Sequence, residues 1–253
     1  MRLASIPKWQ GDKSGRLLAL ANCKGLLIAL GIMGAWLCHL GMLLSLGVSS
    51  VHPFGLVGVI LLQTFLNTGL FITVHDAIHG LVYPANRTVN TVLGALCAIA
   101  YAFLPYKTLL TKHWLHHRYP MSEVDPDFQG TGKAGFWGWY VRFMGQYWGW
   151  KPLIRLASAV GMVSFVFRLS PLNLILFWGI PLLLSSLQLF YFGTYWPHQN
   201  IEQGCYPCAR SYPLPWVLSL LACYHLGYHH EHHEHPEIPW WQLPSLYETQ
   251  SGV

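Results

Sequence analysis

Long uninterrupted runs of apolar residues dominate the pattern of this chain and predict helices that cross a membrane. Four runs are each about as long as a bilayer-spanning helix requires: residues 25–48, 54–74, 153–169 and 172–192. The turn at residues 49–53 joins the first two runs into a hairpin, and Ser170-Pro171 joins the other two. The pattern therefore predicts an all-α integral membrane protein with four transmembrane helices in two hairpins.

Three shorter segments differ from these spans and are expected to lie in the membrane interface. Residues 91–104 and 214–224 are apolar but too short to cross a bilayer. Residues 136–150 contain four tryptophans and two tyrosines, a composition typical of the aromatic belt at the level of the lipid headgroups. We expect interfacial helices in these places and a single domain over residues 1–253.

Composition strengthens the membrane interpretation. Hydrophobic residues make up 53% of the chain and charged residues 10%, and a soluble domain of this length could not bury so much apolar surface. The net charge of +5 is too small and too scattered to indicate nucleic acid as a partner. Lys8, Lys13, Arg16 and Lys24 precede the first span, and no small-residue cleavage site follows it, which favours an uncleaved anchor.

The densest group of polar residues is the stretch CYHLGYHHEHHEHP at residues 223–236, which holds six of the chain's fourteen histidines. If this stretch is one helix, each residue advances about 100° around the axis and four imidazoles share one face. These are His225, His229, His232 and His233, whereas His230 and His235 fall off the face. Because neutral imidazole is a common metal ligand and gains little by packing on itself, the pattern predicts a metal site.

Three other segments contribute histidines to the candidate site. HDAIHG places two histidines one turn apart, KHWLHH repeats the i, i+3, i+4 spacing, and FGTYWPH ends in one more. The full set of candidate metal ligands is His75, His79, His113, His116, His117, His198, His225, His229, His232 and His233. Ten imidazoles exceed what one metal can hold, so we expect two metals, and iron with open positions suits activation of dioxygen. His39, inside a span, and His52, in the far turn, are excluded.

Carboxylates near these histidines are expected to orient the imidazole rings through their second nitrogen. The available partners are Asp76, Asp125 and Asp127. Asp76 follows a candidate ligand directly, and Asp125 lies in the acidic turn after the second histidine cluster. Asp76 and Asp125 are therefore the candidate catalytic residues.

The second span carries a polar stripe that leads towards the histidines. Gln63, Asn67 and Phe71 lie on one helical face with His75 at its end. Polar groups at membrane depth usually face a bundle interior or a cavity, so the stripe is a candidate substrate path. The alternative is that Gln63 and Asn67 merely bond to a neighbouring helix.

Charge and ligand placement together predict one orientation in the membrane. If the short apolar segments do not cross, all histidine-bearing segments emerge on the same face. Every Lys and Arg except Arg168 then lies on that side, which marks it as cytoplasmic. The Cys205-x-x-Cys208 pair is expected to be loop structure without a disulfide, because the cytoplasm is reducing.

The source of electrons is expected to be a separate protein, because the sequence has no dinucleotide-binding fingerprint after a strand. Lys107, Lys112 and Arg118 beside the second histidine cluster could dock an acidic ferredoxin. Their alternative role is the ordinary positive flank of membrane helices.

The motifs resemble those of membrane di-iron oxygenases in the fatty acid desaturase and hydroxylase superfamily, and more closely the bacterial and cyanobacterial β-carotene 4-ketolases. The resemblance covers about residues 63–244 and is carried by HDAIHG, HWLHHRYP with DPDF, FGTYWPH, CARS, and CYHLGYHHEHHEHP with PWW. It implies two Fe ions, O2 as co-substrate, and a carotenoid oxidised at C4 of its β-ionone rings, from β-carotene through echinenone to canthaxanthin. It also implies a bacterial inner membrane or a cyanobacterial thylakoid membrane.

Other functions share part of this pattern. A carotenoid ring hydroxylase, a fatty acyl desaturase or an alkane hydroxylase would keep the metals and change the substrate. A histidine-rich metal transporter would need polar ligands near the membrane midplane, where Gln63 and Asn67 alone qualify. A cytochrome-b-like haem protein would place paired histidines within the spans, whereas these lie at the membrane edge.

Overall fold

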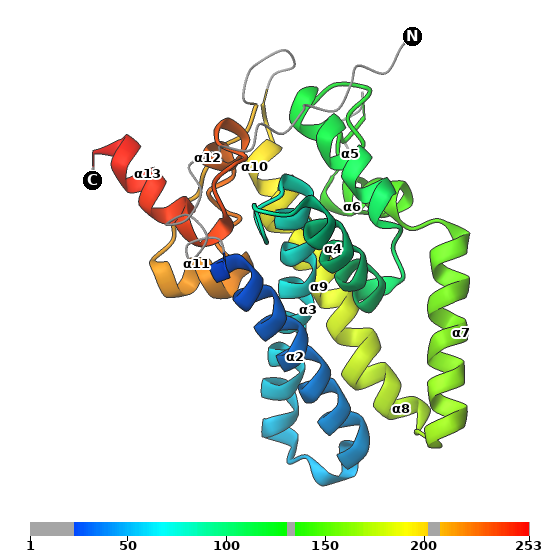
Figure 1. Ribbon diagram of the computed structural model, residues 1–253. Coiled ribbons are helices and arrows are strands. Elements are labelled where there is room, and N and C mark those ends of the chain that lie inside the picture. Colours follow the sequence, from blue (N-terminus) through cyan, green and yellow to red (C-terminus); the bar gives the residue numbers. More distant parts are fainter. Residues whose placement is uncertain (1–22, 131–134, 202–207, 253) are drawn as a thin grey trace.

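The four predicted membrane spans are present in the computed structural model, which describes residues 23–130, 135–201 and 208–252. They are α2 (Cys23–Leu46), α3 (Pro53–His79), α7 (Trp150–Phe167) and the composite helix Pro171–His198. The described residues are otherwise helical or irregular, and the single β feature among them is an isolated bridge between Ser211 and Tyr228. The predicted all-α architecture with two helical hairpins is therefore confirmed (Figure 1).

The first hairpin brings the end of α3 to the place where the histidines gather. Gly47, with φ 76°, follows the end of α2, and the side chain of His52 caps α3 by accepting a hydrogen bond from the Phe54 N–H. α3 ends at His79 because Gly80 takes a left-handed conformation with φ 80°, which glycine adopts without steric cost. The last turn of α3 then lies against α4 and α5.

Two helices joined by a sharp bend cover this end of α3. α4 (Arg87–Ala102) is capped by Asn86, whose side chain accepts hydrogen bonds from the N–H groups of Thr88 and Val89. α5 (Tyr106–Arg118) follows Pro105, and the two helix axes differ in direction by 101°. Neither helix reaches the length of a span by itself, as the sequence predicted for residues 91–104.

The fourth span contains two π-helical turns. In chain order it consists of α8 (Pro171–Leu174), η2 (Ile175–Gly179), α9 (Ile180–Phe190), η3 (Tyr191–Tyr195) and α10 (Trp196–His198). The first π turn ends two residues before Pro181, and the second coincides with the FGTY motif. Single π turns inside α-helices occur frequently at functional sites, and the second one leads straight into His198.

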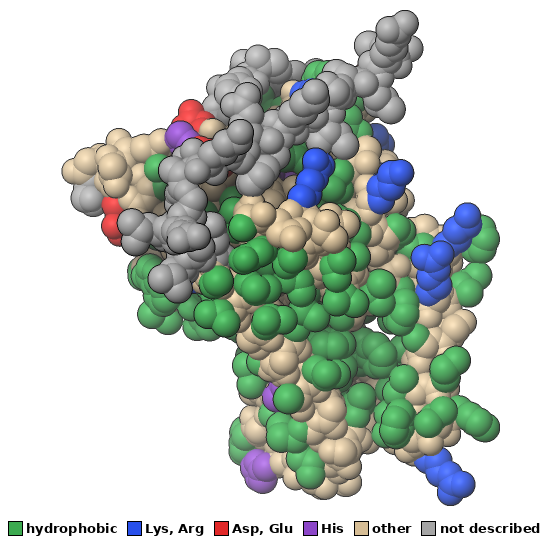
Figure 2. Space-filling view, viewed as in Figure 1, with side chains coloured by type: hydrophobic (Ala, Val, Ile, Leu, Met, Phe, Trp, Pro, Cys, Tyr) green, Lys and Arg blue, Asp and Glu red, His purple; other side chains and the backbone are tan. Residues whose placement is uncertain are grey.

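α7 packs differently from the other spans. Its sole buried residue is Pro152, whereas α3 is buried along most of its C-terminal half. Phe165 of α7 is 87% exposed, so the helix offers apolar side chains to lipid on nearly all sides. Figure 2 shows broad hydrophobic surface over the lower part of the molecule, with most charged side chains of this face near the upper end.

The histidine-rich stretch near the C-terminus is a break between two helices and not one continuous helix. α11 (Trp216–Cys223) ends at Tyr224, whose N–H bonds to the Leu220 carbonyl. Tyr224 and His225 both have left-handed backbone conformations, with φ 49° and 61°, so the helix cannot continue through them. α12 (His229–Glu234) begins after this break. The predicted single helix over residues 223–236 is therefore wrong.

The remaining helices pack around the bundle. α6 (Phe136–Tyr147) carries the aromatic residues of the predicted belt, and its Trp139 and Tyr140 form a buried cluster with Phe190 of the fourth span. The short 3-10 helix η4 (Trp240–Gln242) and α13 (Leu243–Ser251) follow α12.

The remaining sequence expectations concern the basic residues before the first span and the Cys-x-x-Cys pair. Lys8, Lys13, Arg16 and Cys205 lie outside the described residues. Lys24 is described, and its Nζ lies 5.6 Å from the ring centroid of Trp241. Cys208 is disulfide-bonded, so the expectation of a loop without a disulfide is wrong.

Candidate metal centre

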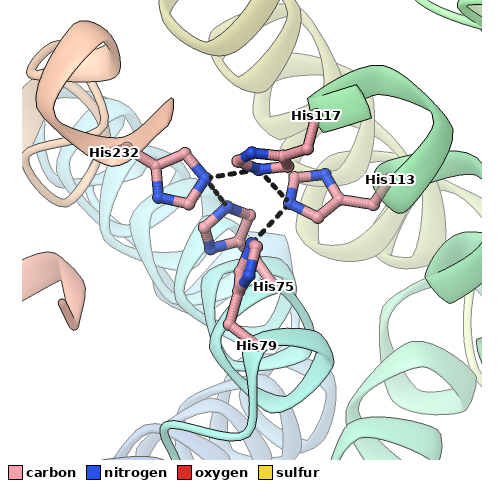
Figure 3. Close-up of side chains that lie close together, drawn as sticks. All are labelled: His75, His79, His113, His117 and His232. Carbon is pink, nitrogen blue, oxygen red and sulfur yellow. Dashed lines mark hydrogen bonds between the residues drawn. The ribbon is translucent and has the colours of Figure 1, made fainter. Parts of the chain in front are cut away.

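Five histidines from α3, α5 and α12 point towards one another (Figure 3). They form the five-histidine group: His75, His79, His113, His117 and His232. Their ligand nitrogens all lie within 4.8 Å of one another. The Nε2 atoms of His79 and His113 are 2.7 Å apart, and those of His75 and His232 are 3.0 Å apart. The rings thus present their nitrogens to a common centre.

Four further histidines form a second set, the four-histidine group. Its members are His116, His198, His229 and His233, and all four are buried. His233 Nε2 lies 3.0 Å from His116 Nε2 and 3.1 Å from His229 Nε2. The ring of His198, at the end of the fourth span, lies edge-on to that of His116 with centroids 4.9 Å apart.

The i, i+3, i+4 spacing places the two groups side by side. On α5, His113 and His117 belong to the five-histidine group and His116 to the other. On α12 the arrangement is reversed, since His229 and His233 join the four-histidine group and His232 joins the five-histidine group. Each of these two helices therefore supplies both groups. The result is two neighbouring sites: the stacked rings of His117 and His233, one from each group, have centroids 4.4 Å apart.

Neighbouring oxygens fix which ring nitrogens carry hydrogen. Three Nδ1–H groups have an oxygen acceptor: His75 bonds to Asp76 at 3.2 Å, His116 to Asp125 at 3.1 Å and His198 to the Cys208 carbonyl at 2.7 Å. In its neutral form each of these rings keeps its hydrogen on Nδ1 and has a lone pair on Nε2. Burial lowers the pKa of His116, but Asp125 and Asp127 outweigh it and raise this pKa to about 8, so a metal would displace the Nε2 proton of that ring. His198 Nε2 is buried without a hydrogen-bond partner. An unpartnered buried acceptor and ring nitrogens that converge on one point both fit a bound metal.

Burial keeps the α12 histidines in the form that binds metals. It lowers the pKa of His229, His232 and His233 well below the ordinary histidine value, and the neighbouring imidazoles lower it further. These rings are therefore neutral at physiological pH. A metal needs neutral imidazole as its ligand, so protonation does not compete with binding near pH 7.

The CARS motif anchors α12 from the side opposite the metals. Ser211 donates a hydrogen bond to Glu231 and accepts one from the His230 N–H at 3.1 Å. The ring of His230 contacts the Ala209 carbonyl at 3.2 Å. This explains why His230 joins neither group, as the helical face predicted.

A cavity lies against both groups and is termed the site cavity. Its lining includes four histidines of the two groups: His75, His113, His116 and His229. Most of the remaining wall is apolar and consists of Phe71, Ile78, Leu109, Phe143, Leu189, Gly193 and Leu226. The other polar residues in the wall are Asp127, Tyr147 and Thr194. The wall of the site cavity therefore suits contact with a hydrocarbon group, and because its volume of about 60 Å³ is smaller than a carotenoid ring, the wall must open to admit one.

Asp127 and Tyr147 form a hydrogen-bonded pair in this wall. The Tyr147 O–H donates to Asp127 Oδ1 at 2.5 Å, and Asp127 Oδ2 lies 3.8 Å from His116 Nδ1. Burial raises the pKa of Asp127 to about 6. Sequence reasoning had offered Asp127 as an orienting acid but missed Tyr147, because it lies among the aromatic residues of the predicted interfacial belt.

The predicted substrate path divides into two parts. Phe71 lines the site cavity, as the stripe predicted. Asn67 Oδ1 instead accepts a hydrogen bond of 2.6 Å from Trp36 Nε1, and Gln63 Oε1 lies 2.6 Å from His39 Nδ1. Gln63 and Asn67 thus bond to α2, which is the alternative that the sequence left open.

His225 lies apart from both histidine groups. Its ring is fully buried between Trp216 and Trp240, at centroid distances of 5.1 and 5.9 Å. The left-handed backbone at His225 turns it away from the face of α12. Nine of the ten predicted ligands are therefore brought together, and His225 is the exception.

These observations define a class: a membrane-embedded helical protein with two adjacent histidine groups that could each hold a metal, and an apolar cavity beside them. The fatty acid desaturase family matches the chain over residues 49–158 and 147–250. The chain belongs to that family and, within it, to the β-carotene ketolases, as its relatives show.

Three relatives illustrate the range of the similarity. The β-carotene ketolase of a Paracoccus species is 39% identical, over 87% of this chain and 90% of that protein. The zeaxanthin 4-ketolase of Chlamydomonas reinhardtii is 35% identical, over 88% of this chain and 51% of that protein. A sphingolipid delta(4)-desaturase of Drosophila melanogaster is 25% identical, over 72% of this chain and 61% of that protein. The ketolases are thus the more similar branch of these two.

Proposed function

We propose that the protein is a carotenoid oxygenase that introduces a keto group at C4 of β-ionone rings, converting β-carotene to echinenone and then canthaxanthin. The observation that carries the proposal is the pair of adjacent histidine groups beside an apolar cavity. The ketolase relatives, at 35–40% identity, support carotenoids as the substrate class. Relatives named as acting on another lipid are more distant, as the 25% identical desaturase illustrates.

Two Fe ions are the proposed cofactors, one held by each histidine group. When bound, they supply the activation of O2. Asp76 and Asp125 hold the Nδ1–H groups of His75 and His116, which keeps the Nε2 lone pairs directed at the metals. The apolar wall around Phe71 excludes water and receives the ring. We propose that these ligands, the carboxylates and the cavity wall belong to a single domain that comprises residues 1–253.

The reaction balances as two successive hydroxylations. In the first, a C4–H bond is replaced by C4–OH, while O2, two electrons and two protons yield the new hydroxyl and one water. In the second, the remaining C4–H is replaced in the same way to give a geminal diol. Loss of water from the diol leaves the ketone. Each ring thus consumes two O2 molecules and four electrons.

The electrons come from an external donor, which we propose is a ferredoxin that approaches the face carrying the histidine groups. Lys107 and Arg118 are exposed on α5 and available to an acidic partner. Lys112 is less available, because its Nζ binds the Gln146 carbonyl and lies 5.2 Å from the ring centroid of Tyr147. We propose that this face is cytoplasmic, in a bacterial inner membrane or cyanobacterial thylakoid membrane.

Expression in a bacterial host that makes β-carotene tests the proposal directly. We expect echinenone and canthaxanthin in the extracted pigments, and about two irons per chain in purified protein, following the two histidine groups. A variant with Ala at both His117 and His233 is the negative control, because it removes one ligand from each group. Formation of hydroxylated carotenoids alone, or full activity with zinc and no iron, would contradict the proposal.

A further inference from the structure

Thr194 is a buried threonine in the wall of the site cavity, in the π-helical turn η3. It is 3% exposed and shares the cavity lining with His116 and His229 of the four-histidine group. It lies four residues before His198, which is a member of that group. Its position is therefore beside the proposed reaction centre.

The hydroxyl of Thr194 is uncommitted, unlike those of the threonines beyond the first turn of the α-helices. Wherever a described threonine lies beyond the first turn of an α-helix, its Oγ1 donates to the carbonyl four residues earlier. These threonines are Thr64, Thr68, Thr73, Thr91, Thr111 and Thr249. Among the described residues, no hydrogen bond is found for Thr194 Oγ1, although it lies deep inside a helix.

The π turn accounts for this difference. In a π-helix the backbone N–H bonds to the carbonyl five residues earlier, so the carbonyls are displaced from the place where a threonine normally finds its acceptor. The turn also brings the backbone close to the opposite wall, since a Cβ atom on Gly193 would lie 2.9 Å from Leu226 Cδ2. The FGTY motif thus places a threonine with an uncommitted hydroxyl in the wall of a narrow cavity.

Among the other polar groups of the wall, Tyr147 and the histidines are already engaged, and Asp127 Oδ2 is an acceptor without a hydrogen-bond donor among the described residues. Tyr147 donates its hydrogen to Asp127, and the histidines are directed at the proposed metals. A substrate oxygen near the metals would therefore meet one free hydroxyl. A hydrocarbon ring cannot use that hydroxyl, whereas an alcohol can both donate to it and accept from it.

We propose that Thr194 binds the C4 hydroxyl of the half-oxidised ring and retains it for the second hydroxylation. The inference rests on the proposed ketolase function. The first hydroxylation creates the C4–OH group, so Thr194 gains its hydrogen-bond partner at that moment. The retained alcohol loses its second C4–H to a further O2 and reductant, and the diol loses water. Thr194 is thus a residue that selects ketone over alcohol as the released product.

The first experiment compares pigments from Thr194→Val and Thr194→Ser in a β-carotene-producing host. Valine keeps the shape and removes the hydroxyl, and we expect the ratio of 4-hydroxy to 4-keto rings to rise about tenfold, since a buried hydroxyl left unpaired weakens binding by that order. Serine keeps the hydroxyl and should hold the ratio near that of the unaltered protein. Thr64→Val, which removes a hydroxyl bonded to the Ile60 carbonyl, is the matched control and should also leave the ratio unchanged.

The second experiment measures binding without turnover. With O2 and reductant withheld, the purified holoenzyme is titrated with 4-hydroxy-β-carotene and with β-carotene. We expect Thr194→Val to weaken alcohol binding about tenfold and to leave hydrocarbon binding unchanged. If valine disturbs folding, as a loss of bound iron would reveal, Thr194→Ala takes its place in both experiments.

Three results separate the possible failures. An unchanged product ratio in the hydroxyl-free variant, at full iron content, would overturn the role of Thr194. Equal loss of affinity for alcohol and hydrocarbon would also overturn it, because it would show a packing effect alone. Absence of any ketone from the unaltered protein would instead overturn the proposed function.

Discussion

The polar residues of α3 divide into two sets that look alike in sequence and differ in what they contact. At membrane depth, Gln63 and Asn67 are each bonded to a side chain of α2 at 2.6 Å. At the end of the helix, His75 and His79 face other imidazoles with their Nε2 atoms. The first set bonds within the pair of helices, although Asn67 Nδ2 has no partner, whereas the ring nitrogens of the second set converge on one point that fits a cation.

This difference separates a packing role from a chemical one. Polar side chains inside a bilayer lower their free energy by bonding to a neighbouring helix, and such bonds need nothing further. An imidazole whose Nδ1–H is held by a carboxylate, as in His75, has only an acceptor at Nε2, and that lone pair is available to a metal. The hydrogen-bond partners of a polar side chain, more than its residue type, therefore identify the candidate metal site.

The largest difference in ketone formation and iron content is expected between alanine variants of two histidines. His229→Ala removes a ligand from the four-histidine group, so we expect no detectable ketone and a fall in iron from about two towards one per chain. His39→Ala removes only the bond to Gln63, which should cost about 0.6–1.7 kcal/mol of stability and preserve the product. Pigment analysis and iron assays check both. Equal damage from the two variants would erase the distinction between the sets.

A smaller effect is expected from a carboxylate that orients a ligand. Asp125→Asn weakens the hold on His116 Nδ1–H and permits the amide to donate to the ring, so iron affinity should fall by about 10–100-fold. The measurement is iron retention against a chelator. Glu123→Gln, an exposed change in the same acidic turn, is the matched control. If both variants lost iron equally, the role of Asp125 as an orienting group would be untenable.

Much of the fold and nine of the ten candidate ligands could be predicted from local pattern. Span length follows from bilayer thickness, and the i, i+3, i+4 spacing holds on α5 and α12 because both are regular helices over their histidines. That spacing even accounts for the division into two groups, since His116 points differently from His113 and His117.

What sequence could not predict depends on backbone conformation and on partners far away in the chain. The left-handed residues Tyr224 and His225 break a stretch that reads as one helix. Asn67 meets Trp36, 31 residues earlier, and no local pattern announces that pair. The importance of Thr194 depends on a π turn, for which the FGTY motif was a signal that only the structure could interpret.

The smallest expected effect tests where the substrate path leaves α3. Phe71→Trp enlarges a side chain in the wall of the site cavity, so we expect poorer acceptance of the ring and a several-fold rise in the ratio of echinenone to canthaxanthin. Asn67→Leu removes the acceptor of the Trp36 N–H, which should cost about 0.6–1.7 kcal/mol of stability and leave the product ratio unchanged. Both variants should retain their iron, because neither residue is in a histidine group.

The product ratios of these two variants show on which side of α3 the substrate path runs. The measurements are product ratios in a β-carotene-producing host, thermal unfolding and iron content. The sequence stripe alone predicted a changed ratio for both variants, whereas the bond between Asn67 and Trp36 predicts it for Phe71→Trp only. If Asn67→Leu shifts the ratio as strongly, the substrate runs between α2 and α3 and the Trp36 bond opens to admit it. An unchanged ratio confines the path to the cavity side, where Phe71 and Leu189 both line the wall beside the proposed ring site.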